Sequence, residues 1–208
     1  MNQPVNLLSQ HFEDRQARIL GEQSSAHFSL FLPLVFRDDE WHLLFQVRSN
    51  NVKQPGEVCF PGGRVDPEDT SYQAAASREL QEELGLEPEH TELLGELDIM
   101  VTPFQFMIHP FIGIIHNESA ISPNPGEVAE IFTVPVSELM TMSPKEHPIR
   151  LDVRPEKGFP YHLIPNGEDY NWRTGYIKEL FYEYDGRIIW GLTARVLAHA
   201  IEELSQIT

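Results

Sequence analysis

Three glutamates, Glu79, Glu82 and Glu83, lie within the five residues that follow Arg78. On a helix that advances about 100° per residue, their carboxylates share one arc. Like charges at this spacing repel one another and lower helix stability. The ordinary interpretation is a solvated acidic surface. The alternative is a site for a hard divalent cation, because Mg²⁺ prefers oxygen ligands and combines few carboxylates with substrate phosphate.

A glycine-containing loop precedes these acids. Gly62 and Gly63 follow a short strand that we predict over residues 57–60. Two adjacent glycines permit a tight turn and the close approach of a ligand to the backbone. A glycine pair alone is common in ordinary loops. A glycine loop that leads into a helix with three acids on one arc favours the divalent-cation site.

The helix that carries the acids is predicted over residues 71–84. Its buried flank is expected to be formed by small and aliphatic residues on a separate arc: Ala76, Leu80 and Leu84. Gly85 is typical of a C-terminal stop. The candidate N-caps share a short polar side chain: Asp69, Thr70 and Ser71. Thr70 together with Gln73 fits a capping box.

The other elements are predicted from apolar periodicity and turn residues. Strands are expected at 28–36, 41–47, 91–100, 106–116 and 128–134, a hairpin at 179–190, and helices at 7–20 and 192–205. The segment 143–170 contains five prolines, which predicts loop and edge strand. It is interpreted as a lid, an oligomer contact or a packed structural loop. Tyr170, Trp172 and Arg173 either stack on a ligand or pack this segment, and packing is favoured.

The composition predicts one soluble domain over residues 1–208. The net charge is −17, so the chain is expected to repel nucleic acid, whereas bound cations would let an anionic substrate approach. The absence of a signal peptide or membrane-spanning run predicts a cytoplasmic protein without membrane association. The single cysteine, Cys59, is interpreted as a small buried side chain rather than a nucleophile. The scattered histidines argue against zinc.

The run from Gly63 to Leu86 resembles the Nudix box, G-x5-E-x7-R-E-U-x-E-E-x-G-U, where U is aliphatic. Its second half matches completely from Arg78 onward. Two departures occur in the first half: Asp69 stands for the first glutamate, and one extra residue precedes Arg78. Strict spacing would select Thr70, and we take Asp69 as the counterpart. The resemblance implies an α/β/α sandwich with a mixed sheet, the box helix on one side and the terminal helices on the other.

The resemblance also implies roles for the box residues in diphosphate hydrolysis. The expected Mg²⁺ or Mn²⁺ ligands are three carboxylates and one backbone carbonyl: Glu79, Glu82, Glu83 and Gly62. Arg78 is expected to orient the glutamates through a salt bridge. The general base is left between Glu79 and Glu83. Glu127 is a further candidate, although a solvent-facing acid is the favoured interpretation there.

A second resemblance concerns the substrate. Residues 43–63 resemble the coenzyme A pyrophosphatase signature L-L-x-x-R-S-x-x-L-R-x-x-x-G-x-V-x-F-P-G-G, with Val52-Lys53 in place of Leu-Arg and one residue missing before Gly56. Residues 190–195 resemble the entry to the last helix of that subgroup. The resemblance implies cleavage of coenzyme A or its thioesters to 4′-phosphopantetheine and adenosine 3′,5′-bisphosphate.

The candidate substrate-binding residues lie near the box: Arg48, Lys53, Gly63 and Arg64. The three basic side chains could contact the phosphates of coenzyme A, and surface solubility is the competing interpretation for each.

Two other functions stay open. One is Nudix hydrolysis of ADP-ribose or NADH, and the other is a non-catalytic nucleotide-binding module. A homodimer is our expectation for the assembly.

Overall fold

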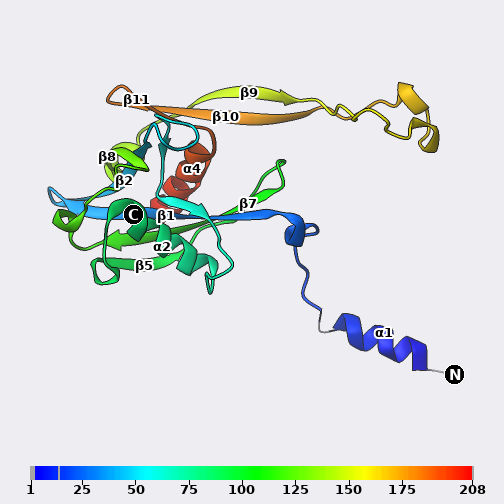
Figure 1. Cartoon of the computed structure of the whole chain (residues 1–208), viewed down its shortest axis with the longest axis horizontal. Helices are drawn as coiled ribbons and strands as arrows, with labels where there is room; N and C mark the ends of the chain where they lie inside the picture. Colours follow the sequence, from blue (N-terminus) through cyan, green and yellow to red (C-terminus); the bar gives the residue numbers. More distant parts are fainter. Residues whose placement is uncertain (1–2, 14, 208) are drawn as a thin grey trace.

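The computed structural model describes residues 3–13 and 15–207 and has an eight-stranded mixed sheet at its centre (Figure 1). The strands are β1 Ala26–Arg37, β2 Glu40–Arg48, β3 Val58–Cys59, β4 Gly62–Arg64, β5 Thr91–Glu96, β6 Met100–Val101, β7 Phe106–Ile115 and β8 Val128–Pro135. The main order is β3-β2-β1-β7-β5, and β4, β6 and β8 pair with β1, β7 and β2 respectively. Only β1 and β7 run parallel. The prediction of a mixed sheet is confirmed.

Helices cover both faces of this sheet because its strands alternate between two apolar cores. Helix α2, Tyr72–Leu84, packs on one core, which includes Phe31, Leu44 and Leu80. Helix α4, Gly191–Ser205, packs on the other core, whose members include Leu32, Phe45 and Leu197. The alternation of β-strand side chains accounts for this division. The predicted α/β sandwich is confirmed, with the acid-bearing helix on one side.

The N-terminal prediction is wrong in two respects. The helix α1 spans Gln3–Glu13 rather than residues 7–20, and it stands away from the sheet (Figure 1). Leu7, Leu8 and Phe12 are therefore exposed. The apolar positions in the sequence correctly indicated an amphipathic helix. They could not show whether the sheet has a surface available for this helix to pack against. Of the two terminal helices, only α4 covers the sheet.

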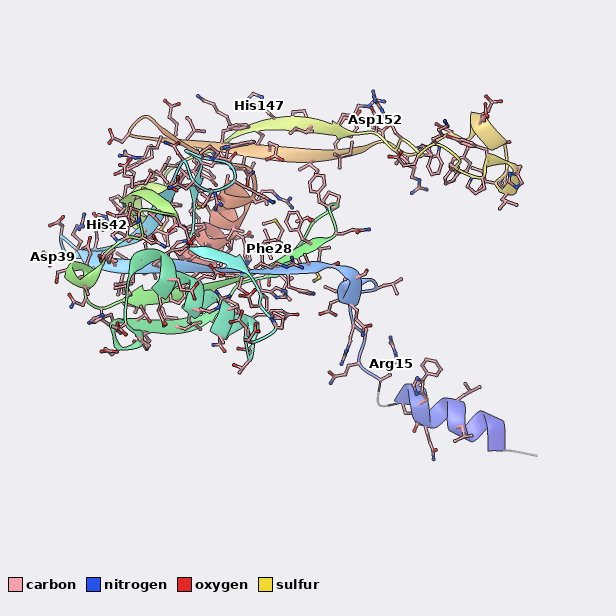
Figure 2. All side chains as sticks on the ribbon, viewed as in Figure 1. Arg15, Phe28, Asp39, His42, His147 and Asp152 are labelled. Atoms are coloured by element: carbon pink, nitrogen blue, oxygen red, sulfur yellow. The ribbon has the colours of Figure 1, made fainter. Side chains whose placement is uncertain are left out.

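A second, three-stranded sheet was not foreseen as a separate unit. It contains β9 Lys145–Leu151, β10 Gly175–Tyr184 and β11 Arg187–Trp190, in the order β11-β10-β9. Beyond Asp152 the chain extends away from the body as an arm (Figures 1 and 2). For residues 143–170, the prediction of loop and edge strand is confirmed. The alternative interpretation, a loop packed against the body of the protein, is wrong. Short helical turns lie at α3 Val136–Leu139, η4 Tyr161–Leu163 and η5 Gly167–Asp169.

The aromatic residues of the arm pack on one another. The Trp172 ring lies 5.7 Å from that of Phe159 and 4.9 Å from that of Tyr170, measured between ring centroids. The favoured expectation, that Tyr170 and Trp172 pack the proline-rich segment, is confirmed. Within the described residues, no helix is long and apolar enough to cross a membrane.

The ends of α2 show how the helix is fixed in register. The Ser71 side chain accepts a hydrogen bond from the Ala74 N–H at 3.1 Å, so Ser71 is the N-cap. The capping box that begins at Thr70 is therefore wrong. Gly85 ends the helix in the left-handed conformation, with φ of 63°, as predicted. Glycine adopts this conformation without the strain that a Cβ atom would introduce.

A histidine pair, the half-buried His27 and the buried His109, lies beside Tyr72 at the start of α2. The His27 Nδ1 atom is 2.9 Å from the His109 Nε2 atom, and the Tyr72 ring stacks on His109. His27 Nε2 faces the carbonyl oxygen of Glu22, which can only accept. A neutral His27 therefore accepts at Nδ1, and His109 donates from Nε2. Burial, reinforced by His27, lowers the pKa of His109 to about 4.

We expect this pair to make the fold less stable in acid. Between the ordinary pKa of 6.5 and about 4, the unfolded chain binds a proton at His109 that the folded chain does not. The free energy of unfolding should thus fall as the pH is lowered through this range, by on the order of 1 kcal/mol. His109→Gln, which keeps a donor toward His27, should remove this contribution.

Urea unfolding at about pH 7.5 and about pH 5 measures the effect. Glu83 acts in the opposite direction, because its pKa is raised to about 7. The measurement is therefore the difference between wild type and variant at each pH. An equal difference at both pH values would contradict the assignment to His109.

Candidate functional site

The candidate site lies where the glycine loop meets the second half of α2. Glu83 is only 5% exposed, beside the apolar residues Leu80 and Leu84 of the same helix. Its Oε2 atom accepts a hydrogen bond from the Gly62 N–H at 2.8 Å. The helix and the loop are therefore joined through a carboxylate, although 21 residues separate the two partners.

Burial makes this carboxylate unusual. It raises the pKa of Glu83 to about 7, while the Gly62 N–H and a hydrogen bond from Gln46 act in the opposite direction. Glu79 and Glu127 add to the rise through like-charge repulsion. The pKa of Glu79 is also raised, first by burial. The site thus gathers more negative charge than its surroundings stabilise, which is the condition that a bound cation would relieve.

Arg78 organises the exposed side of the site. Its Nη1 donates to Glu79 Oε1 at 3.0 Å and to Glu82 Oε2 at 3.2 Å. Its Nε and Nη2 donate to the two carboxylate oxygens of Asp69, both at 2.9 Å. The Asp69 side chain is 6% exposed and also accepts from the Asp66 N–H. Asp69 therefore anchors Arg78, and Arg78 forms ion pairs with the two glutamates, the contacts that the family resemblance implied.

We expect Asp69→Asn to weaken this arrangement. The amide cannot match the charged, two-pronged contact with Arg78. Loss of such a supporting contact typically costs about 10- to 100-fold in metal affinity or activity. Steady-state kinetics of the variant measure the loss. Asp66→Asn is the matched control, because Asp66 lies 3.8 Å from Arg78 Nη2 and is exposed. Equal losses in both variants would contradict the anchoring role.

The lack of a side chain at Gly62 and Gly63 lets the loop lie closer to its neighbours than any Cβ atom would allow. A Cβ atom on Gly62 would lie 2.4 Å from the Ser29 carbonyl oxygen, and the φ of Gly62 is 152°. A Cβ atom on Gly63 would lie 2.3 Å from Glu79 Oε1. The loop therefore approaches both β1 and the acidic helix at contact distance. The contact seen at Gly62 is through its N–H, and its carbonyl as a metal ligand stays a prediction.

The donor set fits Mg²⁺ or Mn²⁺ in chemistry, since it consists of carboxylate oxygens and carries excess negative charge. Among the described residues, however, no three side chains of His, Cys, Asp or Glu form a preassembled metal cluster. Glu79 and Glu82 instead form ion pairs with Arg78.

The basic residues predicted to bind substrate, Arg48, Lys53 and Arg64, have different surroundings. Arg48 Nε donates to the Lys53 carbonyl oxygen at 2.7 Å, so Arg48 braces its own loop. Lys53 and Arg64 are exposed. The Arg64 carbonyl oxygen accepts from Arg78 Nη2 at 3.3 Å, which ties the end of β4 to the helix. The structure brings the backbone of Arg64 to the acidic site. Substrate binding by Arg48, Lys53 and Arg64 stays a prediction.

Two residues near Glu83 were missed or undervalued by the sequence. Glu127 was interpreted as a solvent-facing acid, but it is half-buried and raises the pKa values of Glu79 and Glu83. Its loop is fixed by a hydrogen bond from the Asn124 N–H to the Glu83 carbonyl oxygen. Gln46 was not considered. The alternation of β2 was the available signal, since it places Gln46 on the same face as Leu44, toward α2.

Cys59 is half-buried on β3, opposite Gln46. Burial raises the pKa of its thiol, and Glu83 contributes to the rise. A thiol with a raised pKa is a poor nucleophile because the thiolate is the reactive form. The structure therefore agrees with the interpretation of Cys59 as a small side chain rather than a nucleophile, although the residue is half-buried rather than fully buried.

Comparison with known proteins identifies the family to which the chain belongs. The NUDIX domain family model matches residues 30–156, more than half of the chain. The mouse peroxisomal coenzyme A diphosphatase NUDT7 is 43% identical over 114 residues, which cover 54% of this chain and 48% of the mouse protein. The aligned part thus spans about half the length of that relative.

Two bacterial relatives match over a greater length. An uncharacterized Nudix hydrolase NudL from Enterobacter is 32% identical over 81% of this chain and 78% of that protein. NudL from Photorhabdus laumondii is 29% identical over 88% of this chain and 87% of that protein. The solved structure of the Nudix hydrolase RenU from M. Smegmatis gives a TM-score of 0.46 at 18% identity, covering 54% and 71% of the two chains. Family membership therefore follows from the sequence matches.

Proposed function

The chain belongs to the NUDIX domain family, and from this premise we propose that it hydrolyses a diphosphate bond in coenzyme A or an acyl-coenzyme A. The products would be 4′-phosphopantetheine and adenosine 3′,5′-bisphosphate. The observation that carries the hydrolase proposal is the buried Glu83 carboxylate, held by the Gly62 N–H and repelled by neighbouring acids. A buried acid with a raised pKa in such a setting is typical of a functional site.

The residues proposed to hold Mg²⁺ or Mn²⁺ are the three box glutamates and the loop carbonyl: Glu79, Glu82, Glu83 and Gly62. When bound, the cation offsets phosphate charge and lowers the pKa of a bound water. Arg78 is proposed to orient Glu79 and Glu82 until these carboxylates leave Arg78 and bind the cation. Glu79 and Glu83 are the candidate general bases. Burial raises the pKa of both carboxylates, and that of Glu83 reaches about 7, which suits a proton acceptor near neutral pH.

The substrate proposal rests on the mouse relative and on nearby cations. The matched relative is named a coenzyme A diphosphatase. Coenzyme A carries a 3′-phosphate in addition to its diphosphate. Lys53 and Arg64 make no side-chain hydrogen bond or ion pair with any other described residue, so their charges are free to meet phosphate. Arg48 is proposed to support the Lys53 loop in the same region.

A substrate panel tests the proposal. Purified protein is incubated with coenzyme A, acetyl-coenzyme A, ADP-ribose or NADH, with Mg²⁺, Mn²⁺ or EDTA, and the products are identified by mass spectrometry. We expect adenosine 3′,5′-bisphosphate from the first two substrates and no turnover with EDTA. Faster cleavage of ADP-ribose or NADH would move the assignment to another Nudix substrate. No cleavage of any diphosphate would contradict a catalytic role.

A further inference from the structure

Arg195 is the one half-buried arginine without a partner in the part of the chain that the structure describes. Four arginines are half-buried there: Arg48, Arg78, Arg187 and Arg195. Arg48 donates to a backbone carbonyl oxygen, and Arg78 and Arg187 form ion pairs with acids. Arg195 has no hydrogen bond or ion pair with another described residue. The chain has 32 acidic residues and only 15 lysines and arginines, so a lack of acids does not explain this. A guanidinium partly removed from water needs an acceptor, and Arg195 therefore calls for a specific explanation.

Arg195 lines a pocket between α4 and the strands β6 and β7. The pocket has a volume of about 270 Å³. Its apolar wall includes Pro110 and the side chains of Ile99 and Val101, which are 45% and 53% exposed. Pockets that hold a whole drug-sized ligand begin at ~300 Å³. This pocket therefore suits one charged group and the atoms next to it, rather than a complete coenzyme.

His199 adds a second polar side chain to the pocket wall. It lies one helical turn after Arg195 on α4, so both side chains project from the same face of the helix. The Asp98 N–H donates to His199 Nε2 at 3.1 Å, which requires a neutral imidazole with its proton on Nδ1. The Asp98 side chain is the one acid of the lining and is 93% exposed, so solvent screens its charge. The pocket thus offers a guanidinium and an imidazole N–H as donors to an anion.

The pocket lies two strands away from the glycine loop. Leu30 of β1 pairs with Gly62 on one side and with Pro110 of β7 on the other. Neighbouring strands are about 4.8 Å apart, so Pro110 lies on the order of 10 Å from Gly62. The atoms of a single nucleotide span such a distance. One molecule can therefore place its diphosphate at the loop and a second phosphate at Arg195.

We propose that the pocket lined by Arg195 and His199 is the subsite for the 3′-phosphate of the coenzyme A substrate. The planar guanidinium matches a phosphate group through two parallel N–H···O hydrogen bonds. The apolar wall of Ile99 and Val101 contacts the adjoining nucleoside. The inference rests on the proposed coenzyme A substrate, and it assigns to α4 a phosphate contact that lies outside the box and outside residues 43–63.

The kinetic test uses Arg195→Gln, which keeps a long side chain of high helix propensity and removes the guanidinium. The KM for coenzyme A should rise roughly 10- to 100-fold, because a charge-assisted contact with phosphate is lost. The kcat should change little, since the contact is equally present before and during the reaction. With dephospho-coenzyme A, which lacks the 3′-phosphate, variant and wild type should have equal KM. Steady-state kinetics of the full-length protein with Mg²⁺ measure both values.

A binding measurement tests the same contact without catalysis. Isothermal titration calorimetry in EDTA compares adenosine 3′,5′-bisphosphate with adenosine 5′-monophosphate. The wild type should bind the bisphosphate roughly tenfold more tightly or better, and Arg195→Gln should bind the two nucleotides equally. Arg154→Gln is the matched control, because it removes the same charge from an exposed position on the arm. It should behave as the wild type in both experiments.

Three results would overturn the subsite. The first is an equal rise in KM for coenzyme A and dephospho-coenzyme A in Arg195→Gln, and the second is an equal loss in Arg154→Gln. The third is equal affinity of the wild type for the two nucleotides, a measurement that holds even if Arg195→Gln is unstable. Cleavage of coenzyme A without any preference for the 3′-phosphate would support the proposed function and contradict the subsite. Preferential binding of the bisphosphate through Arg195, in a protein that cleaves no diphosphate, would contradict the proposed hydrolysis and support the subsite.

Discussion

Glu83→Gln is expected to lower kcat by about 10²- to 10⁴-fold, the range associated with loss of a general base. The amide oxygen can still accept from the Gly62 N–H, so the loop contact is kept. What is lost is the negative charge and the basic oxygen. Initial rates with saturating coenzyme A and Mg²⁺ measure the effect.

The same variant should be at least as stable as the wild type at about pH 8. The pKa of Glu83 is raised to about 7 in the folded protein, above its ordinary 4.5. Above pH 7 the fold therefore carries a buried charge that it disfavours, and the neutral amide removes this cost. Glu87→Gln, an exposed acid just after the helix, is the control and should retain wild-type kcat. A thermal midpoint well below wild type would attribute the lost activity to misfolding and contradict this prediction.

Gly62→Ala is expected to destabilise the protein severely. Its Cβ atom would lie 2.4 Å from the Ser29 carbonyl oxygen and 2.9 Å from the Leu30 Cα atom. Both are backbone atoms of a central strand, which cannot move aside easily. Overpacking and backbone strain together suggest a loss of about 3 kcal/mol or more in the free energy of unfolding. Chemical denaturation at neutral pH measures this loss.

Two other glycines provide the comparison. Gly95→Ala meets no atom within 4 Å and should change stability little. For Gly63→Ala, the three atoms nearest to the new Cβ all belong to the carboxylate of Glu79, which is the far end of a flexible side chain. This substitution should reduce activity while leaving most of the stability. If Gly62→Ala unfolds no more readily than Gly95→Ala, the packing of the loop against β1 is not as the structure shows.

The sequence by itself determined the elements and their chemical character. Strand alternation and helical periodicity are set by local backbone geometry, so they predicted the main strands, the helix at residues 71–84 and the last helix. The mixed sheet was an implication of the family resemblance. The same periodicity placed Glu79, Glu82 and Glu83 on one arc. The pairing of Arg78 with these acids followed from the family resemblance and is seen in the hydrogen bonds of the site.

Only the tertiary structure decided how these acids differ. Glu82 and Glu83 are adjacent and chemically identical, yet the Glu82 side chain is 56% exposed and Glu83 is 5% exposed. Glu83 accepts a hydrogen bond from the Gly62 N–H of another strand, and its carbonyl oxygen accepts from Asn124 in the loop that carries Glu127. Burial, charge repulsion and hydrogen bonding depend on contacts between residues far apart in the chain. A helical wheel contains none of these contacts, so the sequence could identify the candidate ligands but not the one whose pKa is raised to about 7.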